Sequence, residues 1–172
     1  MTRMEARRET YTVYTDGGYS VATASGGCAF VILRGGELIM EGSSRIEHAS
    51  SQRAELEAVL LALWEIPERS DVHIIMDSRY AIQVLDAPRP PRFTRKNMDL
   101  IRRFFEIKGQ RRLGVSFEWV RSHTGDSWNE YCDRLCTEAP LQERPFILRK
   151  YVTNALKKET KIIHDERKSN ES

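Results

Sequence analysis

The chain is organised around the stretch Tyr11-Thr12-Val13-Tyr14-Thr15-Asp16-Gly17-Gly18. Its β-branched and aromatic side chains alternate, which predicts a β-strand over about residues 10–16. We expect the strand to end at Asp16, because the two glycines that follow favour a turn. A second short apolar run, residues 72–76, also leads directly into an aspartate, Asp77. If the two strands lie side by side, their carboxylates form a candidate metal site.

Length and composition indicate one globular domain. A chain of 172 residues can build one well-packed core but not two ordinary domains. It has no apolar run of about 18 residues that would predict a membrane span, and its charged start lacks the apolar stretch of a secretory signal. Three cysteines are an odd and sparse set, typical of reduced thiols in a cytoplasmic protein. Two of them, Cys132 and Cys136, stand one helical turn apart, which favours packing over metal ligation.

The net charge of +2 is unevenly distributed along the chain. Residues 89–112 contain nine Lys and Arg against two acidic residues, and residues 144–172 contain eight against four. The remainder is therefore strongly acidic. This separation suits an enzyme that binds a polyanion beside a metal centre. Solvated helix faces with clustered charges would give the same totals, so charge alone leaves both interpretations open.

The expected elements follow the order βββαβααβα. The strands are expected at residues 10–16, 28–33, 38–41, 72–76 and 115–120, and the helices at residues 52–64, 78–85, 98–108 and 127–138. Strands joined through helices should run parallel to the first strand, whereas the first three are expected to be antiparallel neighbours. The pattern therefore predicts an α/β fold with a mixed sheet.

Three segments are expected along the chain. They are a polar lead-in over residues 1–9, one domain over residues 10–139, and a basic extension over residues 140–172. Helical periodicity over residues 146–160 predicts that the extension is partly helical. Within the domain, the prolines and arginines of residues 86–96 predict an extended basic linker in place of a helix.

Four carboxylates are candidate metal ligands because of their placement. Asp16 and Asp77 follow expected strands, while Glu55 and Asp133 lie in expected helices. Hydrolysis of a phosphodiester by two divalent ions needs several carboxylates around cations about 3.5–4 Å apart. Each candidate alone is a weak signal, because aspartates at strand ends often cap helices. Helix phase does not separate Glu55 from Glu57, and Asp133 has the position of an ordinary solvated helix charge.

The assembled pattern is more specific than its parts. Its segments are Thr15-Asp16-Gly17-Gly18, Arg53-Ala54-Glu55-Leu56-Glu57-Ala58, Met76-Asp77-Ser78-Arg79-Tyr80, Val120-Arg121-Ser122-His123-Thr124-Gly125 and Asn129-Glu130-Tyr131-Cys132-Asp133-Arg134-Leu135. In this order they resemble the type 1 ribonuclease H family over about residues 10–138. The resemblance implies a ribonuclease H-like fold, with three antiparallel and two parallel strands in a five-stranded mixed sheet flanked by helices. It also implies a metal-dependent endonuclease that cuts the RNA strand of RNA/DNA hybrids with two Mg²⁺ ions, or Mn²⁺ as substitute, leaving 5′-phosphomonoesters.

The resemblance also assigns roles to individual residues. It implies that Asp16, Glu55, Asp77 and Asp133 hold the metal ions, and thereby prefers Glu55 over Glu57. His123 matches a loop histidine that assists proton transfer or product departure, which the near-neutral titration of histidine permits. The substrate-binding residues implied are Gly17, Ser51, Gln52, Arg79, Arg95, Lys96 and Asn97. His48, His73 and His164 have no such context.

The chain departs from the family pattern in three places. Residues 19–25 lack the asparagine, glycines and prolines usual after the first motif, and Ser51 and Gln52 stand where asparagines are usual before the glutamate. The helix known as the basic handle is missing between Leu85 and Lys96. These departures bear on substrate affinity, and they leave two alternatives open. One is a non-catalytic module that binds hybrids or double-stranded RNA, and the other is a nuclease of the same fold that acts on DNA. The expected partner is an RNA/DNA hybrid, bound by a cytoplasmic monomer with no membrane contact.

Overall fold

A computed structural model of the protein describes residues 7–47, 49–92 and 96–152. The helices and strands are β1 (Thr10–Ser20), β2 (Ser25–Arg34), β3 (Glu37–Glu47), α1 (Ser51–Glu65), β4 (Asp71–Met76), α2 (Arg79–Leu85), α3 (Met98–Gln110), β5 (Gly114–Trp119), α4 (Ser127–Glu138), the short 3₁₀ helix η1 (Ala139–Leu141) and β6 (Phe146–Lys150). None of the helices in these ranges is long and apolar enough to cross a membrane.

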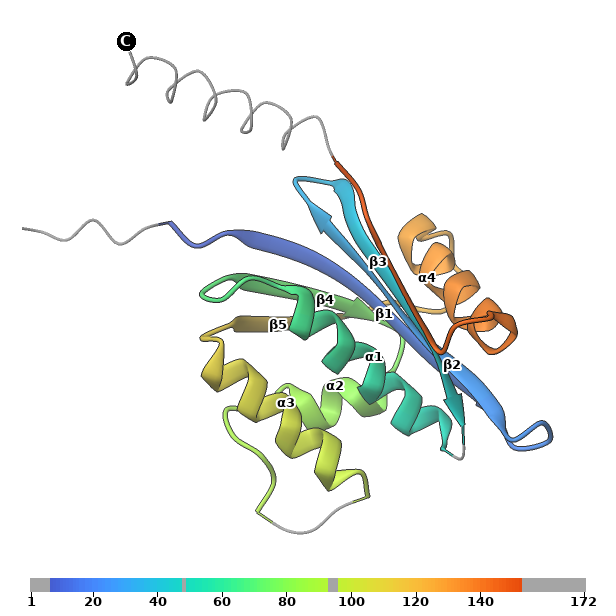
Figure 1. Cartoon of the computed structure of the whole chain (residues 1–172). Helices are drawn as coiled ribbons and strands as arrows, with labels where there is room; N and C mark the ends of the chain where they lie inside the picture. Colours follow the sequence, from blue (N-terminus) through green and yellow to red (C-terminus); the bar gives the residue numbers. More distant parts are fainter. Residues whose placement is uncertain (1–6, 48, 93–95, 153–172) are drawn as a thin grey trace, which may run out of the picture.

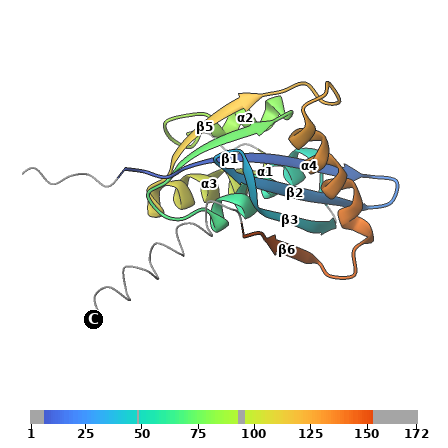
Figure 2. The same ribbon diagram turned by 90° about the horizontal axis from the view of Figure 1, so that it is seen from above.

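The strands form one mixed sheet in the order β5-β4-β1-β2-β3-β6 (Figure 1). β1, β2 and β3 are antiparallel neighbours, whereas β4 runs parallel to β1 and β5 parallel to β4. The expected α/β fold with three antiparallel and two parallel strands is therefore confirmed. The expected number of five strands is wrong, because β6 adds a sixth at the edge beyond β3 (Figure 2).

Residues 146–150 form this strand where a helix was expected. They pair antiparallel with β3, whose edge would otherwise leave its backbone groups unpaired. Pro145 precedes the strand, and its carbonyl accepts a hydrogen bond from the Arg45 amide at 2.8 Å, which aligns the two strands. The rest of the expected helix, from residue 153 onward, lies outside the described residues.

Helices cover both faces of the sheet. α1, α2 and α3 lie on one face and α4 on the other (Figure 1). The larger core lies beneath α1 and α3 and includes Phe30, Leu56, Leu63, Ile74, Ile101 and Phe104. A smaller core lies beneath α4 and includes Tyr14, Val31, Ile75, Cys132 and Cys136. Each face of β1 is thus in contact with a helix.

β1 does not end at Asp16. It continues through Gly17 and Gly18 to Ser20, paired with β2, and the turn follows at residues 21–24. The expectation of a glycine turn is therefore wrong. Gly17 instead allows close packing, because a Cβ there would collide with the backbone of Ala54 and Glu55 in α1.

The segment between α2 and α3 agrees with the expected linker where it is described. Residues 86–92 and 96–97 contain no helix or strand. α3 begins directly after Asn97, which has a left-handed backbone with φ of 63°.

Candidate active site

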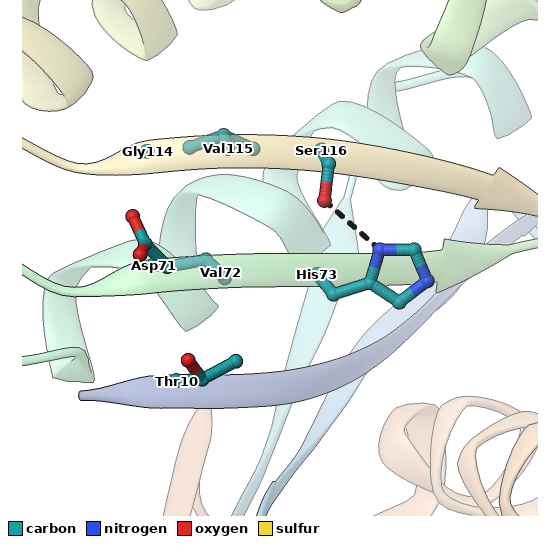
Figure 3. A pocket seen from close by; sticks show the side chains of 7 residues that line it. All are labelled: Thr10, Asp71, Val72, His73, Gly114, Val115 and Ser116. Carbon is teal, nitrogen blue, oxygen red and sulfur yellow. Dashed lines mark hydrogen bonds between the residues drawn. The ribbon is translucent and has the colours of Figure 1, made fainter. Parts of the chain in front are cut away.

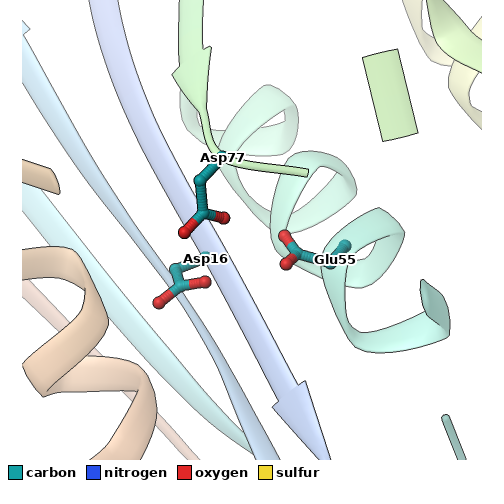
Figure 4. A group of neighbouring side chains, drawn as sticks. All are labelled: Asp16, Glu55 and Asp77. Carbon is teal, nitrogen blue, oxygen red and sulfur yellow. The ribbon is translucent and has the colours of Figure 1, made fainter. Parts of the chain in front are cut away.

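Three of the expected carboxylates meet at one place (Figure 4). Asp16 comes from β1, Asp77 follows the last residue of β4, and Glu55 comes from the first half of α1. β1 and β4 are parallel neighbours with Tyr14 opposite Ile75, and each aspartate stands two residues further along its chain. One carboxylate oxygen from each of the three residues lies within 4.8 Å of the other two. We call these three residues the acidic cluster.

The glycine at position 17 explains how Glu55 reaches the two aspartates. The α1 backbone at Ala54 and Glu55 fills the space that a Cβ of residue 17 would occupy. The start of α1 is fixed by Ser50, whose hydroxyl accepts a hydrogen bond from the Arg53 amide at 3.2 Å. Its close approach to β1 brings the Glu55 carboxylate to the sheet.

Burial makes the acidic cluster unfavourable for negative charge. Asp16 and Glu55 are 8% and 9% exposed. Burial, with the charges of Asp16 and Asp77, raises the pKa of Glu55 to about 9. Burial also raises the pKa of Asp16 to about 7, together with the charge of Asp77 and a hydrogen bond with Asp133. The Gly17 amide, which donates to Asp16 Oδ1 at 2.9 Å, opposes this rise.

These residues fit a divalent cation. The second carboxylate oxygen of Glu55, Oε2, is buried and has no hydrogen-bond partner among the described residues. A buried oxygen of this kind normally has a partner. A hard divalent ion would supply one, and it would also neutralise the repulsion among the three carboxylates.

Asp133 lies beside the acidic cluster on α4. The hydrogen bond that contributes to the raised pKa of Asp16 joins it to that residue. Asp133 is not one of the three residues whose oxygens lie within 4.8 Å of one another. Asp16 and Asp133 together line an open pocket of about 480 Å³ between the β1–β2 hairpin and the end of α4. The pocket gives a phosphate-sized group access to both carboxylates.

His123 is exposed in the loop between β5 and α4. Its backbone is left-handed, with φ of 56°, and Gly125 nearby also has a positive φ. His73 lies elsewhere, on β4 in a surface pocket of about 270 Å³ (Figure 3). Its two ring nitrogens are hydrogen-bonded to Ser116 at 2.9 Å and to Glu118 at 2.8 Å. His48 and His164 lie outside the described residues.

Comparison with known proteins identifies the family. A family model described as RNase H matches residues 8–140. The chain belongs to the RNase H family. Among curated relatives, "Ribonuclease HI" of Synechocystis sp. is 30% identical over 147 residues, which cover 79% of this chain and 91% of the relative. "Ribonuclease H" of Trichodesmium erythraeum is 29% identical, covering 79% and 92%. "Ribonuclease H" of Methylorubrum extorquens is 32% identical over 142 residues, covering 73% of this chain and 58% of the relative. The expected family is confirmed.

Two of the substrate-binding residues expected from the RNase H resemblance lie at the start of α1. Ser51 and Gln52 are exposed. The Ser51 hydroxyl donates to the carbonyl of Tyr19 at 3.4 Å, and Tyr19 lines the same pocket as Gly17. Ser51 therefore lies next to the β1–β2 hairpin, close to the pocket that Asp16 lines.

A second group of expected residues lies around α2 and the start of α3. Asn97 donates to the Tyr80 hydroxyl at 3.1 Å, and that hydroxyl donates to the Lys96 carbonyl at 3.3 Å. The Arg79 guanidinium stacks 4.0 Å from the ring centre of Trp119. Arg95 lies outside the described residues.

The structure adds two residues to those expected from the RNase H motifs. The Trp119 indole donates from Nε1 to the carbonyl of Asp77 at 3.0 Å, so it fixes the chain where β4 ends. Arg53 forms a two-pronged ion pair with Asp99, at 2.6 and 3.1 Å, which joins the starts of α1 and α3. Arg53 belongs to a quoted motif, but sequence spacing alone gives no sign of its partner.

Proposed function

We propose that this protein is a ribonuclease H that hydrolyses the RNA strand of RNA/DNA hybrids. The observation that carries the proposal is the acidic cluster of Asp16, Glu55 and Asp77 in a chain of the RNase H family. Asp133 completes the proposed set of metal ligands from the opposite face of the sheet.

The proposed cofactor is a pair of Mg²⁺ ions, with Mn²⁺ as substitute. When bound, the ions stabilise the attacking and leaving oxygens of the phosphodiester and lower the pKa of the attacking water. Asp16, Glu55, Asp77 and Asp133 would hold the ions. Because burial and mutual repulsion raise the pKa values of Asp16 and Glu55, cation binding near neutral pH should be accompanied by proton release. His123 is proposed to accept or deliver a proton at the exposed side of the site.

Hybrid recognition is proposed to depend on two surfaces beside the acidic cluster. Gly17, Ser51, Gln52 and Arg79 would contact the minor groove, where the 2′-hydroxyls of RNA distinguish it from DNA. Lys96 and Asn97, together with Arg95, would contact the DNA strand through its phosphates. The arrangement of exposed polar groups on α1, α2 and the start of α3 supports this assignment.

We also propose that the protein is a cytoplasmic monomer. Its three cysteines are free and buried, which suits a reducing compartment. Light scattering coupled to size-exclusion chromatography tests the oligomeric state, and a mass twice that of the 172-residue chain would contradict a monomer.

Cleavage of a labelled hybrid in the presence of Mg²⁺ tests the proposed function. We expect the wild type to cut the hybrid, and Asp16→Asn to reduce cleavage by at least about a hundredfold, since it weakens the metal site. Single-stranded RNA and duplex DNA serve as control substrates. If the wild type does not cut the hybrid, or if the variant cuts it at the wild-type rate, the proposal is wrong. Cleavage of duplex DNA would indicate the DNA-cutting alternative, and hybrid binding that is indifferent to Mg²⁺ and unaccompanied by cleavage would indicate the non-catalytic one.

A further inference from the structure

Glu41 is a buried carboxylate that lies outside the acidic cluster. It belongs to β3 and is 2% exposed. The Tyr131 hydroxyl donates to its Oε2 at 2.5 Å, and the Arg149 guanidinium donates to its Oε1 at 3.1 Å. These two contacts join three elements, because Tyr131 lies on α4 and Arg149 on β6.

The strand register places this group beneath α4. Arg149 stands opposite Glu41, Glu41 opposite Val31, and Val31 opposite Tyr14, across β6, β3, β2 and β1. Residues directly opposite each other in antiparallel strands point to the same face of the sheet. Val31 and Tyr14 belong to the core beneath α4. Glu41 and Arg149 therefore meet α4 on the face that carries Asp133.

Tyr131 stands two residues before Asp133 on α4. Successive helical residues are about 100° apart, so these two side chains point to nearly opposite sides of the helix. The contact of Tyr131 with β3 thus acts together with the buried Cys132 and Cys136 to hold the rotation of α4, and with it the direction in which Asp133 points. Cys132, between them, donates its thiol to the Ala29 carbonyl at 3.4 Å, which fixes the depth of the helix on the sheet.

Arg149 is the cationic partner of the Glu41 carboxylate, which also has a hydrogen bond with Tyr151. A buried carboxylate without a cationic partner is unfavourable, and it becomes protonated or admits water. Either change disturbs the acceptor of the Tyr131 hydroxyl. The Arg149 side chain itself is half-exposed, so its removal opens no cavity in the core.

We propose that β6 is part of the catalytic centre, and that Arg149 is a positioning residue that holds Asp133 toward Asp16 through Glu41 and Tyr131. The catalytic consequence rests on the proposed function. β6 lies beyond residues 8–140, the segment that matches the family model. Residues that hold the active site in place would thus lie outside the segment that matches the family model.

Substitution of Arg149 tests this role, with a matched control on the same strand. Arg149→Ala and Lys150→Ala each remove one positive charge from β6, but Lys150 follows Arg149 directly and so points to the opposite face. We expect Arg149→Ala to lower kcat for hybrid cleavage by about tenfold to a hundredfold, as loss of a group that orients a metal ligand does. KM for the hybrid should stay within about twofold, and the Mg²⁺ concentration for half-maximal activity should rise. Lys150→Ala should change none of these, and Arg149→Lys should restore part of kcat.

Hydrogen exchange gives a readout that does not depend on activity. In Arg149→Ala, amides of α4 over residues 127–138 should exchange faster, while those of α1 over residues 51–65 keep the wild-type rate. Tyr131→Phe removes only the hydroxyl, and it should reproduce both the lower kcat and the faster exchange of α4. It replaces Arg149→Ala as the test if that variant fails to fold. Equal kcat and equal α4 exchange in the Arg149→Ala and Lys150→Ala proteins would overturn the proposal. If the wild type does not cleave hybrids, the proposed function is wrong, and the exchange of α4 still decides whether Arg149 holds the helix.

Discussion

Glu55 shows how the cost of burying a carboxylate is linked to metal binding. Its carboxylate is 9% exposed, one of its oxygens lacks a partner among the described residues, and Asp16 and Asp77 add repulsion. In the metal-free protein this arrangement opposes folding. A divalent ion that binds only the folded state would repay the cost, so metal affinity and stability are coupled.

The metal-free protein should therefore lose stability as the pH rises. The pKa of Glu55 is raised from 4.5 to about 9 on folding, so above pH 4.5 the unfolded chain releases a proton that the folded protein retains. The contribution of Glu55 to the free energy of unfolding should then fall between about pH 4.5 and pH 9. Glu55→Gln removes this loss and should stabilise the metal-free protein at pH 8 by on the order of 1–3 kcal/mol.

Urea unfolding in EDTA at pH 4 and pH 8 measures this difference. Glu65→Gln, on the last turn of the same helix, is the control and should leave the pH dependence unchanged. Equal free energies of unfolding for the wild type and Glu55→Gln at pH 8 would show that ionisation of Glu55 does not destabilise the folded protein. Mg²⁺ should stabilise the wild type more than the Glu55→Gln variant.

The same residue marks a limit of prediction from sequence. Periodicity places Glu55 and Glu57 at similar angles from the apolar face of α1, so it cannot choose between them. Their contacts in the structure distinguish the two residues. Glu55 faces the aspartates, whereas Glu57 Oε1 lies 3.8 Å from Arg53 Nε. Asp16 and Asp77 were predictable as neighbours, because two adjacent parallel strands bring residues of equal register together, although only Asp77 follows its strand and Asp16 lies within β1.

At the scale of elements, the contact between β1 and α1 determines whether the acidic cluster forms. α1 crosses β1 at Gly17, where the helix backbone leaves no room for a Cβ. At Gly18, the next position, the nearest atom to a Cβ would be the Cys136 sulfur at 3.9 Å, an ordinary contact distance. The two glycines therefore have different roles, although they are adjacent.

Substitution of each glycine by alanine should show this difference. Gly17→Ala must push α1 away from β1, which should destabilise the protein by about 1–3 kcal/mol or more. It should also reduce hybrid cleavage, because Glu55 moves with the helix. Gly18→Ala is the matched control and should retain most of the stability and activity. Thermal unfolding and the cleavage assay measure both, and equal effects of the two substitutions would contradict this account of the contact.

Elements also show why local sequence signals fail in places. Two glycines after a strand indicate a turn or a close approach, and only the position of α1 decides between them. The helical period expected over residues 146–160 rested on widely spaced apolar residues, and the partner of residues 146–150, β3, lies about a hundred residues earlier. Strand pairing over such a separation leaves no trace in the local pattern. The helices over residues 52–64 and 127–138 were predictable because their apolar faces repeat over several turns.

In the molecule as a whole, the acidic cluster and the basic residues lie on different elements. The carboxylates lie near the middle of the sheet, while the described basic residues of the range 89–112 lie on the linker, on α3 and directly after α3. A hybrid can thus be attracted by the basic segment while its scissile phosphate is held at the metal site. This division predicts that the linker affects substrate affinity and leaves the chemical step unchanged.

Neutralising the exposed linker residues Arg92 and Lys96 by glutamine tests this division of roles. KM for the hybrid should rise at 150 mM salt with little change in kcat, and the slope of log affinity against log salt should fall by about one per lost phosphate contact. Arg69→Gln is the control, because this exposed residue precedes β4 at the end of the strand away from Asp77. An unchanged salt slope in the double variant would show that the linker does not contact the substrate.

The proposed function requires that the four carboxylates form a metal-dependent centre that cuts RNA paired with DNA. The most direct measurement follows both strands of a hybrid, each carrying its own label, with Mg²⁺ and with EDTA. We predict RNA fragments with 5′-phosphate ends, an intact DNA strand, and no cleavage in EDTA or by Asp77→Asn. Cleavage of the DNA strand, or RNA cleavage that continues in EDTA or in the variant, would contradict the account.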